Sequence, residues 1–247
     1  MEFKKFFVKN KCKFSVDIQP KQEWDRFLLS SRVERMDANR YDLFDKTRCD
    51  FHLDRYRFAC EYAEEKKIVD CASGTGYGAH LLETLGRAKS IVGIELSDKA
   101  VEYANRMYSS DRVSFRQGTI LNLPFYDNSV DIFTSFETIE HVEDERRQLE
   151  EIYRVLKAGG LYVMSTPNDW ESDAIHPYHV RQYDYYSLRE KISKKFELLK
   201  IYNQNSGTPN RKENNHQPRS IYLSNDSNYH LAECFIVVAK KPAQSFV

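Results

Sequence analysis

The sequence has few cysteines, and no two of them stand at the spacing typical of metal or redox motifs. Its five cysteines are Cys12, Cys49, Cys60, Cys71 and Cys234. An odd number without a CxxC pair argues against a disulfide framework and against a zinc site built from cysteine pairs. Because free thiols are typical of the reducing cytosol, we expect a cytoplasmic protein.

The chain also lacks an excess of charge of either sign. Lysine plus arginine and aspartate plus glutamate both number 37 among the 247 residues. Nucleic-acid binding generally requires a clustered basic surface, so we expect no nucleic-acid partner. A short basic run at Lys4, Lys5, Lys9, Lys11 and Lys13 is interpreted as a solvated tail.

Long hydrophobic runs are missing as well. No apolar stretch approaches the roughly 20 residues that a transmembrane helix needs. The apolar stretch near the N-terminus is too short for the core of a signal peptide. We therefore expect neither a membrane span nor a secretory leader.

What the sequence does contain is an alternation of apolar strands and amphipathic helices. Strands are predicted at residues 67–71, 90–95, 113–117, 130–135, 161–165, 196–202 and 233–240. Helices are predicted at residues 22–36, 51–65, 98–108 and 144–156, through residues 79–82, and after about residue 186. This order predicts a doubly wound α/β domain, in which helices cover both faces of a parallel sheet.

A glycine-rich turn follows the first predicted strand and opens the next helix. It reads Asp70-Cys71-Ala72-Ser73-Gly74-Thr75-Gly76-Tyr77-Gly78, and its small residues let the backbone approach a ligand closely. The spacing G-x-G-x-G differs from the G-x-G-x-x-G of dinucleotide sites, where a helix N-terminus binds a pyrophosphate. Asp70 would disfavour a pyrophosphate but suits a ligand with an ammonium group and a sulfonium centre.

A carboxylate ends the second predicted strand. Glu95 follows the turn by about 20 residues, the position at which an acid accepts hydrogen bonds from ribose hydroxyls in doubly wound sheets. The alternative is a solvated acid at a strand end. The preceding glycine-rich turn favours the ribose role.

Together these segments resemble the class I S-adenosylmethionine-dependent methyltransferases. The resemblance extends from about residue 32 to 183, and the segments that carry it are residues 68–78, 92–97, 118–125, 135–142 and 154–160. It implies a Rossmann-like, mostly parallel sheet of seven strands, whose antiparallel last strand is inserted beside the sixth. It also implies S-adenosyl-L-methionine as the cofactor.

The resemblance assigns the cofactor-binding positions. They are His52, Arg55, Tyr56, Asp70, Ala72, Ser73, Gly74, Gly76, Glu95, Leu96, Thr119, Ile120, Phe136 and Glu137. Two positions depart from the family pattern: Ala72 replaces a glycine of some members, and Thr119 replaces an aspartate that meets the adenine amino group in many. Backbone groups of Ile120 are then expected to contribute to adenine binding, with Leu96 and Phe136 packing on the ring.

A second resemblance lies upstream of the turn. Glu34-Arg35-Met36, followed by His52-Leu53-Asp54-Arg55-Tyr56, is similar to bacterial methyltransferases associated with surface polysaccharide synthesis. In that comparison His52, Arg55 or Tyr56 lies over the methionine end of the cofactor, where an arginine can pair with a carboxylate. The alternative is an amphipathic helix whose charges face water.

These comparisons suggest how the chain is divided. Residues 1–50 are predicted to form an N-terminal extension or helical cap, and residues 51–247 the methyltransferase domain. Insertions on the acceptor side are expected near residues 166–190 and 203–230. The second insertion contains a long polar stretch, which is typical of functional or disordered loops.

Methyl transfer to a hydroxyl usually needs a general base, and histidine suits that role near neutral pH. The candidate bases are His141, after the fourth strand, and His176 and His179, after the fifth. The alternative for His141 is a capping role, and for His179 a structural hydrogen bond. Arg181 could bind an anionic part of the acceptor. No set of carboxylates and histidines stands out as a metal site, so no metal is expected.

The favoured hypothesis is O-methylation of a sugar, nucleotide-sugar or glycan intermediate. Methylation of another small acceptor at oxygen or nitrogen stays open, as does a cofactor-binding protein without catalysis. A nicotinamide-dependent dehydrogenase is disfavoured by the glycine spacing. A nucleic-acid methyltransferase is disfavoured by the net charge and by the lack of a motif for a flipped base after the fourth strand.

Overall fold

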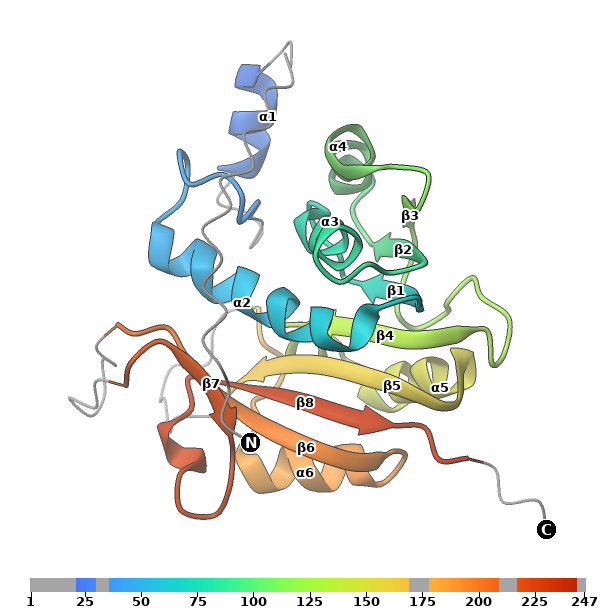
Figure 1. Cartoon of the computed structure of the whole chain (residues 1–247), viewed down its shortest axis with the longest axis vertical. Coiled ribbons are helices and arrows are strands. Elements are labelled where there is room, and N and C mark those ends of the chain that lie inside the picture. Colours follow the sequence, from blue (N-terminus) through green and yellow to red (C-terminus); the bar gives the residue numbers. More distant parts are fainter. Residues whose placement is uncertain (1–20, 30–35, 169–177, 209–216, 244–247) are drawn as a thin grey trace.

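One mixed β-sheet organises the chain (Figure 1). The computed structural model describes residues 21–29, 36–168, 178–208 and 217–243. The strands are β1 (Lys67–Cys71), β2 (Ser90–Glu95), β3 (Val113–Gln117), β4 (Val130–Phe136), β5 (Leu156–Pro167), β6 (Glu197–Asn205), β7 (Ser220–Leu223) and β8 (Cys234–Lys240). They lie in the order β3-β2-β1-β4-β5-β8-β6-β7.

The direction of the strands defines where a ligand can bind. Strands β1 to β5 pair in parallel, and β8 pairs antiparallel with both β5 and β6. The chain moves from β1 outward to β2 and β3, then returns to β4 on the other side of β1. Such a reversal leaves a crevice beyond the carboxyl ends of β1 and β4, where doubly wound sheets bind ligands.

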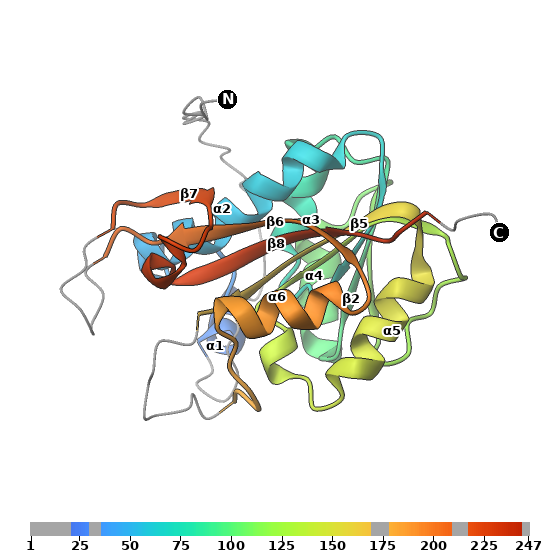
Figure 2. The same cartoon turned by 90° about the horizontal axis from the view of Figure 1, so that it is seen from below.

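Helices cover both faces of the sheet (Figure 2). They are α1 (Lys21–Leu28), α2 (Lys46–Ala63), α3 (Tyr77–Thr84), α4 (Asp98–Tyr108), α5 (Glu145–Val155) and α6 (Tyr185–Ser193). Side chains of α2, α3 and α4 share one apolar cluster with the sheet, and those of α5 and α6 share the other. Ser97 caps α4 as predicted, because its side chain accepts a hydrogen bond from the Ala100 amide at 3.3 Å.

The prediction of seven strands is wrong by one, because part of the polar stretch forms strand structure. Residues Asn203, Gln204 and Asn205 extend β6, and β7 pairs with them. Buried amide side chains are tolerated here because they have partners. The Asn203 amide donates to the Asn228 carbonyl at 2.7 Å, and that of Gln204 donates to the Phe51 carbonyl at 2.6 Å.

Two predicted helix boundaries also differ. Helix α2 begins at Lys46 rather than at residue 51, because the Asp45 side chain accepts a hydrogen bond from the Arg48 amide at 3.0 Å and caps it there. Helix α1 ends at Leu28, and residues 30–35 of the longer predicted helix lie outside the described residues. The division of the chain at residue 50 stays a prediction.

Within the described ranges, every helix is too short or too polar to cross a membrane.

Candidate active site

The turn after β1 exposes backbone beside an open space. Ala72, Gly74 and Gly76 have φ angles of 58°, 54° and 89°, in the left-handed region. A Cβ placed on Gly74 would meet no atom within 4 Å, whereas one on Gly76 would lie 2.7 Å from the Phe115 ring. Gly76 therefore serves packing, and the space beside Gly74 can hold a ligand.

Glu95 lies directly beside this turn. Its carboxylate accepts a hydrogen bond from the Gly74 amide at 3.1 Å and another from the Ser97 amide at 3.0 Å. The Gly118 amide, after β3, donates to the Glu95 carbonyl at 3.0 Å. The segments that follow β1, β2 and β3 therefore converge at Glu95, which is half-buried and can still accept hydrogen bonds from a ligand.

The residues predicted to contact adenine differ in exposure. Leu96 is 71% exposed, although it is a large apolar side chain. Ile120 and Phe136 are buried in the two apolar clusters. Thr119 is exposed, and its hydroxyl accepts a hydrogen bond from the Leu121 amide at 3.2 Å. An exposed leucine next to Glu95, the predicted ribose acceptor, is consistent with a surface that a flat aromatic ring covers.

Asp70 and Tyr56 are bonded to each other in the core. The Tyr56 hydroxyl lies 3.2 and 3.3 Å from the two carboxylate oxygens of Asp70, and the Thr134 hydroxyl donates to one of them at 2.7 Å. Burial raises the pKa of Asp70 to about 7. The Tyr56 ring packs edge-on against Phe136 at 4.8 Å. Asp70 thus acts through the shape and charge of the turn, and the Tyr56 hydroxyl already has a partner.

Arg55 is a fully buried cation, and one of its guanidinium nitrogens has no hydrogen-bond partner among the described residues. Its Nε donates to Gln204 Oε1 at 2.7 Å, and its guanidinium lies 4.6 Å from the centre of the Phe51 ring. Nη1 lies 3.5 Å from Glu137 Oε1, and Nη2 has no hydrogen-bond partner in the described part of the chain. Burying such a donor unpaired costs free energy, so this nitrogen suits an anionic ligand. Burial lowers the pKa of the neighbouring His52 well below its ordinary value.

Glu137 follows β4 in a left-handed conformation, with a φ of 48°. Its amide donates to the Ser165 carbonyl at 3.1 Å, and its carboxylate accepts from the Ser165 hydroxyl at 2.8 Å and from the Cys234 thiol at 3.3 Å. Non-glycine residues in this conformation are uncommon and often lie at functional sites. The bonds to Ser165 and Cys234 fix the edge of the crevice between β4 and β5.

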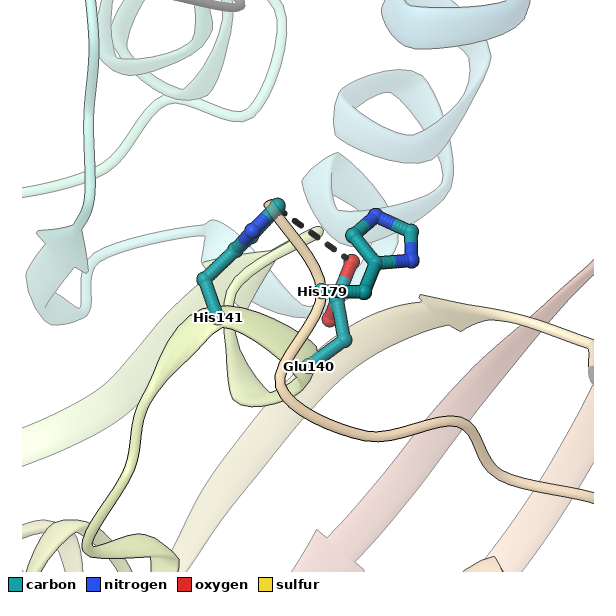
Figure 3. A group of neighbouring side chains, drawn as sticks. All are labelled: Glu140, His141 and His179. Carbon is teal, nitrogen blue, oxygen red and sulfur yellow. Dashed lines mark ion pairs between the residues drawn. The ribbon is translucent and has the colours of Figure 1, made fainter. Parts of the chain in front are cut away.

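Two of the three predicted base candidates lie together, and Figure 3 shows them with Glu140. The ring centres of His141 and His179 are 4.8 Å apart, and His141 Nε2 lies 4.0 Å from Glu140 Oε1. His141 Nδ1 lies 2.9 Å from the Tyr178 carbonyl, which can only accept a hydrogen bond. Nδ1 therefore carries the proton, and in the neutral ring Nε2 holds the lone pair.

The other acceptor-side predictions have different outcomes. His176, Glu34 and Arg35 lie outside the described residues. Arg181 has a structural role, because its guanidinium donates to the carbonyls of Ile139, Val142 and Glu143. These bonds hold the chain after β5 against the turn after β4, so the hypothesis that Arg181 binds an anionic acceptor loses its support.

Sequence reasoning missed two residues that position this site. Gln204 orients Arg55 across 149 positions of sequence, and the Thr166 hydroxyl donates to Glu140 Oε2 at 3.0 Å. Neither residue belongs to a motif. Gln204 lies in the polar stretch that was predicted as a loop, so no local signal indicated its contact with Arg55.

The described residues fit an S-adenosyl nucleoside. The space beside Gly74 admits a ligand, Glu95 offers an acceptor for ribose hydroxyls, and the orphaned Nη2 of Arg55 offers a cationic donor for a carboxylate. Glu95 and Arg55 thus match two polar parts of such a molecule, its ribose and its carboxylate. The predicted roles of individual residues stay predictions.

The sequence of this chain is similar to those of known methyltransferases. Residues 69–164 match the family model described as a methyltransferase domain. A probable S-adenosylmethionine-dependent methyltransferase of Mycolicibacterium smegmatis is 31% identical over 132 residues, which cover 51% of this chain and 50% of the relative. The ubiquinone/menaquinone biosynthesis C-methyltransferase UbiE of Geotalea daltonii is 36% identical over 145 residues, covering 53% of this chain and 60% of the relative.

A solved structure extends the likeness to the whole fold. A SAM-dependent methyltransferase of Thermotoga maritima superposes with a TM-score of 0.63 and 21% identity, over 89% of this chain and 99% of the other. At that identity the likeness shows a shared Rossmann-like methyltransferase fold. The chain spans about half the length of the curated relatives it matches. These matches indicate a methyltransferase domain and do not identify the acceptor.

Proposed function

We propose that the protein is an S-adenosylmethionine-dependent methyltransferase that methylates a hydroxyl group of a sugar, nucleotide-sugar or glycan intermediate. The match of residues 69–164 to a methyltransferase domain supports the first part of this proposal. The bound cofactor supplies an electrophilic methyl group, and the protein supplies alignment and a site from which water is excluded. Glu95 would bind the ribose hydroxyls and Leu96 the adenine face. Arg55 would pair with the carboxylate through Nη2.

The observation that carries this proposal is the orientation of His141. Its Nδ1 is held by the Tyr178 carbonyl at 2.9 Å, so Nε2 is the atom able to accept a proton. His141 lies just after β4, at the carboxyl edge of the sheet that also carries the turn and Glu95. A sugar hydroxyl arriving at this edge could transfer its proton to Nε2 as the methyl group is transferred.

Exposed aromatic side chains near this edge support a sugar acceptor. Tyr178 and Tyr186 are about half exposed, at 48% and 51%. Aromatic faces bind the apolar face of sugars. Tyr185, next to Tyr186 in the chain, is buried and stacks on Tyr229 at 5.2 Å.

A second candidate is methylation at carbon. It is favoured by the 36% identity to a relative that is named a C-methyltransferase. A carbon acceptor also has to lose a proton, so the same histidine would serve. The two candidates therefore differ in the acceptor rather than in the site.

The test is methyl transfer from labelled S-adenosylmethionine to two panels of acceptors. One panel holds nucleotide-sugars and phosphorylated sugars, and the other holds demethylated quinols. We expect product with a sugar, and a fall in turnover of about 100-fold or more in His141→Asn, the range for loss of a general base. Affinity for S-adenosylhomocysteine should be unchanged in this variant. Transfer to quinols alone would replace the sugar proposal, and cofactor binding without transfer to either panel would contradict both.

A matched control is His230→Asn. His230 is exposed on the short helix at Tyr229–Leu231, so this exchange removes an imidazole elsewhere. Its turnover should equal that of the unmodified protein. A loss as large as that of His141→Asn would show that the assay reports a general effect of histidine removal.

A further inference from the structure

Three side chains at the acceptor edge bring metal-ligating atoms together. Glu140 and His141 belong to the short helix Ile139–His141 after β4, and His179 lies on the segment after β5 (Figure 3). One carboxylate oxygen and one nitrogen from each ring lie within 4.8 Å of one another. No metal site was predicted from the sequence, because no set of carboxylates and histidines stood out there.

Each of two ligands is held by a second partner. The Thr166 hydroxyl donates to Glu140 Oε2 at 3.0 Å, which directs Oε1 toward the histidines. The Tyr178 carbonyl lies 2.9 Å from His141 Nδ1, which leaves the lone pair on Nε2. Metal-binding histidines and carboxylates are almost always oriented in this way, by a carbonyl on the other ring nitrogen or a donor on the other oxygen.

The segment carrying His179 is fastened to the same place. The Val180 amide donates to the Glu140 carbonyl at 2.9 Å, so the backbone next to His179 is bonded to the backbone of the acid. Arg181 adds its bonds to the carbonyls of Ile139 and Val142. Hydrogen bonds therefore already fix the backbone segments that carry the three side chains relative to each other.

The carboxylate of Glu140 is buried, and one of its oxygens has no hydrogen-bond partner among the described residues. Glu140 is 1% exposed, and the oxygen without a partner in this part of the chain is Oε1. The nearby cation Arg55 makes its ion pair with Glu137, at 3.5 Å. A buried carboxylate in this position gains either a proton or a cation.

We propose that Glu140, His141 and His179 bind one divalent cation of the zinc type. Two imidazoles and one carboxylate suit Zn²⁺, Co²⁺ or Ni²⁺ better than Mg²⁺ or Ca²⁺, which prefer oxygen ligands. Three protein ligands leave at least one position for water or an acceptor, as in catalytic zinc sites. With bonds of about 2.0–2.2 Å, ligand atoms are about 3–3.5 Å apart. The largest present separation, up to 4.8 Å, therefore needs to contract by about 1.5 Å, which rotation of the two partly exposed rings can supply.

The cation has a consequence for the reaction, and this part rests on the proposed function. A hydroxyl bound to the cation would release its proton to solvent water more readily than a free one. The cation would then take the place of His141 Nε2 in lowering the barrier to deprotonation. The methyl transfer itself and the cofactor site would stay the same.

The experiment uses untagged full-length protein, freed of metal with a chelator that is then removed. Zn²⁺ and Co²⁺ are titrated by calorimetry, with Mg²⁺ as the hard-cation comparison, and visible absorption follows the Co²⁺. We expect one equivalent of Zn²⁺ and of Co²⁺ to bind, with a Co²⁺ spectrum that indicates nitrogen ligands and low coordination. Glu140→Gln and His179→Ala should each weaken binding about tenfold or more, while His230→Ala should not.

Several results would overturn the inference. They are absence of Zn²⁺ binding, an equal loss in His230→Ala, and full Zn²⁺ affinity in both Glu140→Gln and His179→Ala. Affinity for S-adenosylhomocysteine, measured on the same metal-free samples, shows that each variant is folded. Full methyl transfer by metal-free protein that binds no Zn²⁺ would remove the cation and leave the proposed function intact. Failure of methyl transfer by protein that does bind Zn²⁺ would remove the proposed function and leave the cation site intact.

Discussion

Glu95 does two things at once, since its carboxylate organises the turn and faces the predicted ribose position. Replacing it by glutamine keeps the size but removes the charge and one acceptor. Hydrogen bonds to charged groups contribute roughly 1.5–3 kcal/mol. We therefore expect Glu95→Gln to weaken the binding of S-adenosylhomocysteine by about 10- to 100-fold in calorimetry. Glu102→Gln, which alters an exposed glutamate of α4, is the control, and equal affinities in the two variants would refute the ribose role.

Asp70 predicts a pH dependence of stability. Its pKa in the folded protein is raised to about 7, against an ordinary value of 3.8. Because the pKa of Asp70 is raised in the folded protein, its contribution to stability is complete below pH 4 and is lost as the pH rises through 7. Between those limits the unfolding free energy falls by at most about 1.4 kcal/mol per pH unit.

Urea unfolding at several pH values tests this. The difference in unfolding free energy between the unmodified protein and Asp70→Asn should shrink, and can change sign, as the pH is raised from 5 to 8. Asp111→Asn, at an exposed position, should leave the profile unchanged. A difference that stays constant over this range would show that Asp70 titrates normally.

Single residues of the cofactor site were predictable where spacing along the chain carries the information. Glu95 ends a strand at a fixed distance from the turn, and the structure places it 3.1 Å from the Gly74 amide. The partner of Arg55 was not predictable. Gln204 is brought to it by the return of β6 through the sheet, and no local pattern encodes that contact.

At the scale of elements, two glycines of the same turn are needed for different reasons: Gly78 for helix packing and Gly74 for ligand binding. A Cβ on Gly78 would lie 1.9 Å from the Tyr56 ring, where α2 packs on α3, while one on Gly74 would meet nothing. We expect Gly78→Ala to lower the unfolding free energy by about 1–3 kcal/mol, the usual range for overpacking. Gly74→Ala should lower it by about 1 kcal/mol through its positive φ, and should lose affinity for S-adenosylhomocysteine.

Thermal or urea unfolding and calorimetry on both variants make the comparison. Gly78→Ala should lower the unfolding free energy more than Gly74→Ala does, and Gly74→Ala should lower the affinity for S-adenosylhomocysteine more than Gly78→Ala does. Undiminished cofactor affinity in Gly74→Ala would mean that the ligand does not occupy the open space beside the turn.

Elements were predictable from periodicity except where polar side chains replace apolar ones. Strands β1 to β4 were located to within one residue, since they are apolar runs with turns at both ends. The end of β6 was predicted as loop, because asparagine and glutamine normally disfavour strands. The amides of Asn203 and Gln204 are bonded to the Asn228 and Phe51 carbonyls, and this tertiary pairing outweighs the local preference. Strand β7 is a short run, Ser-Ile-Tyr-Leu, inside the polar stretch that was predicted as loop.

For the whole molecule, the order of elements predicted the doubly wound sheet, and the family resemblance implied the antiparallel last strand. It did not predict how the C-terminal strands are attached to the rest. Arg219, just before β7, bonds to Asp54 through two nitrogens at 2.6 and 2.7 Å and to Asp50 at 2.6 Å. Both acids belong to α2, and Asp54 is 165 positions earlier in the sequence. This ion pair therefore joins the edge of the sheet to the helix that carries Arg55.

Removing this pair should loosen the edge strand without unfolding the domain. Arg219 is partly exposed, so the expected loss in Arg219→Ala is about 1–2 kcal/mol of unfolding free energy, between the values for exposed and buried pairs. Because charge screening weakens partly exposed pairs, the loss should shrink at 1 M salt. Urea unfolding at low and high salt measures it, with Arg189→Ala, on the exposed face of α6, as the control. Faster hydrogen exchange should be confined to β7 and neighbouring β6 amides. Exchange that rises equally in β1 and β4 would mean that Arg219 supports the whole sheet.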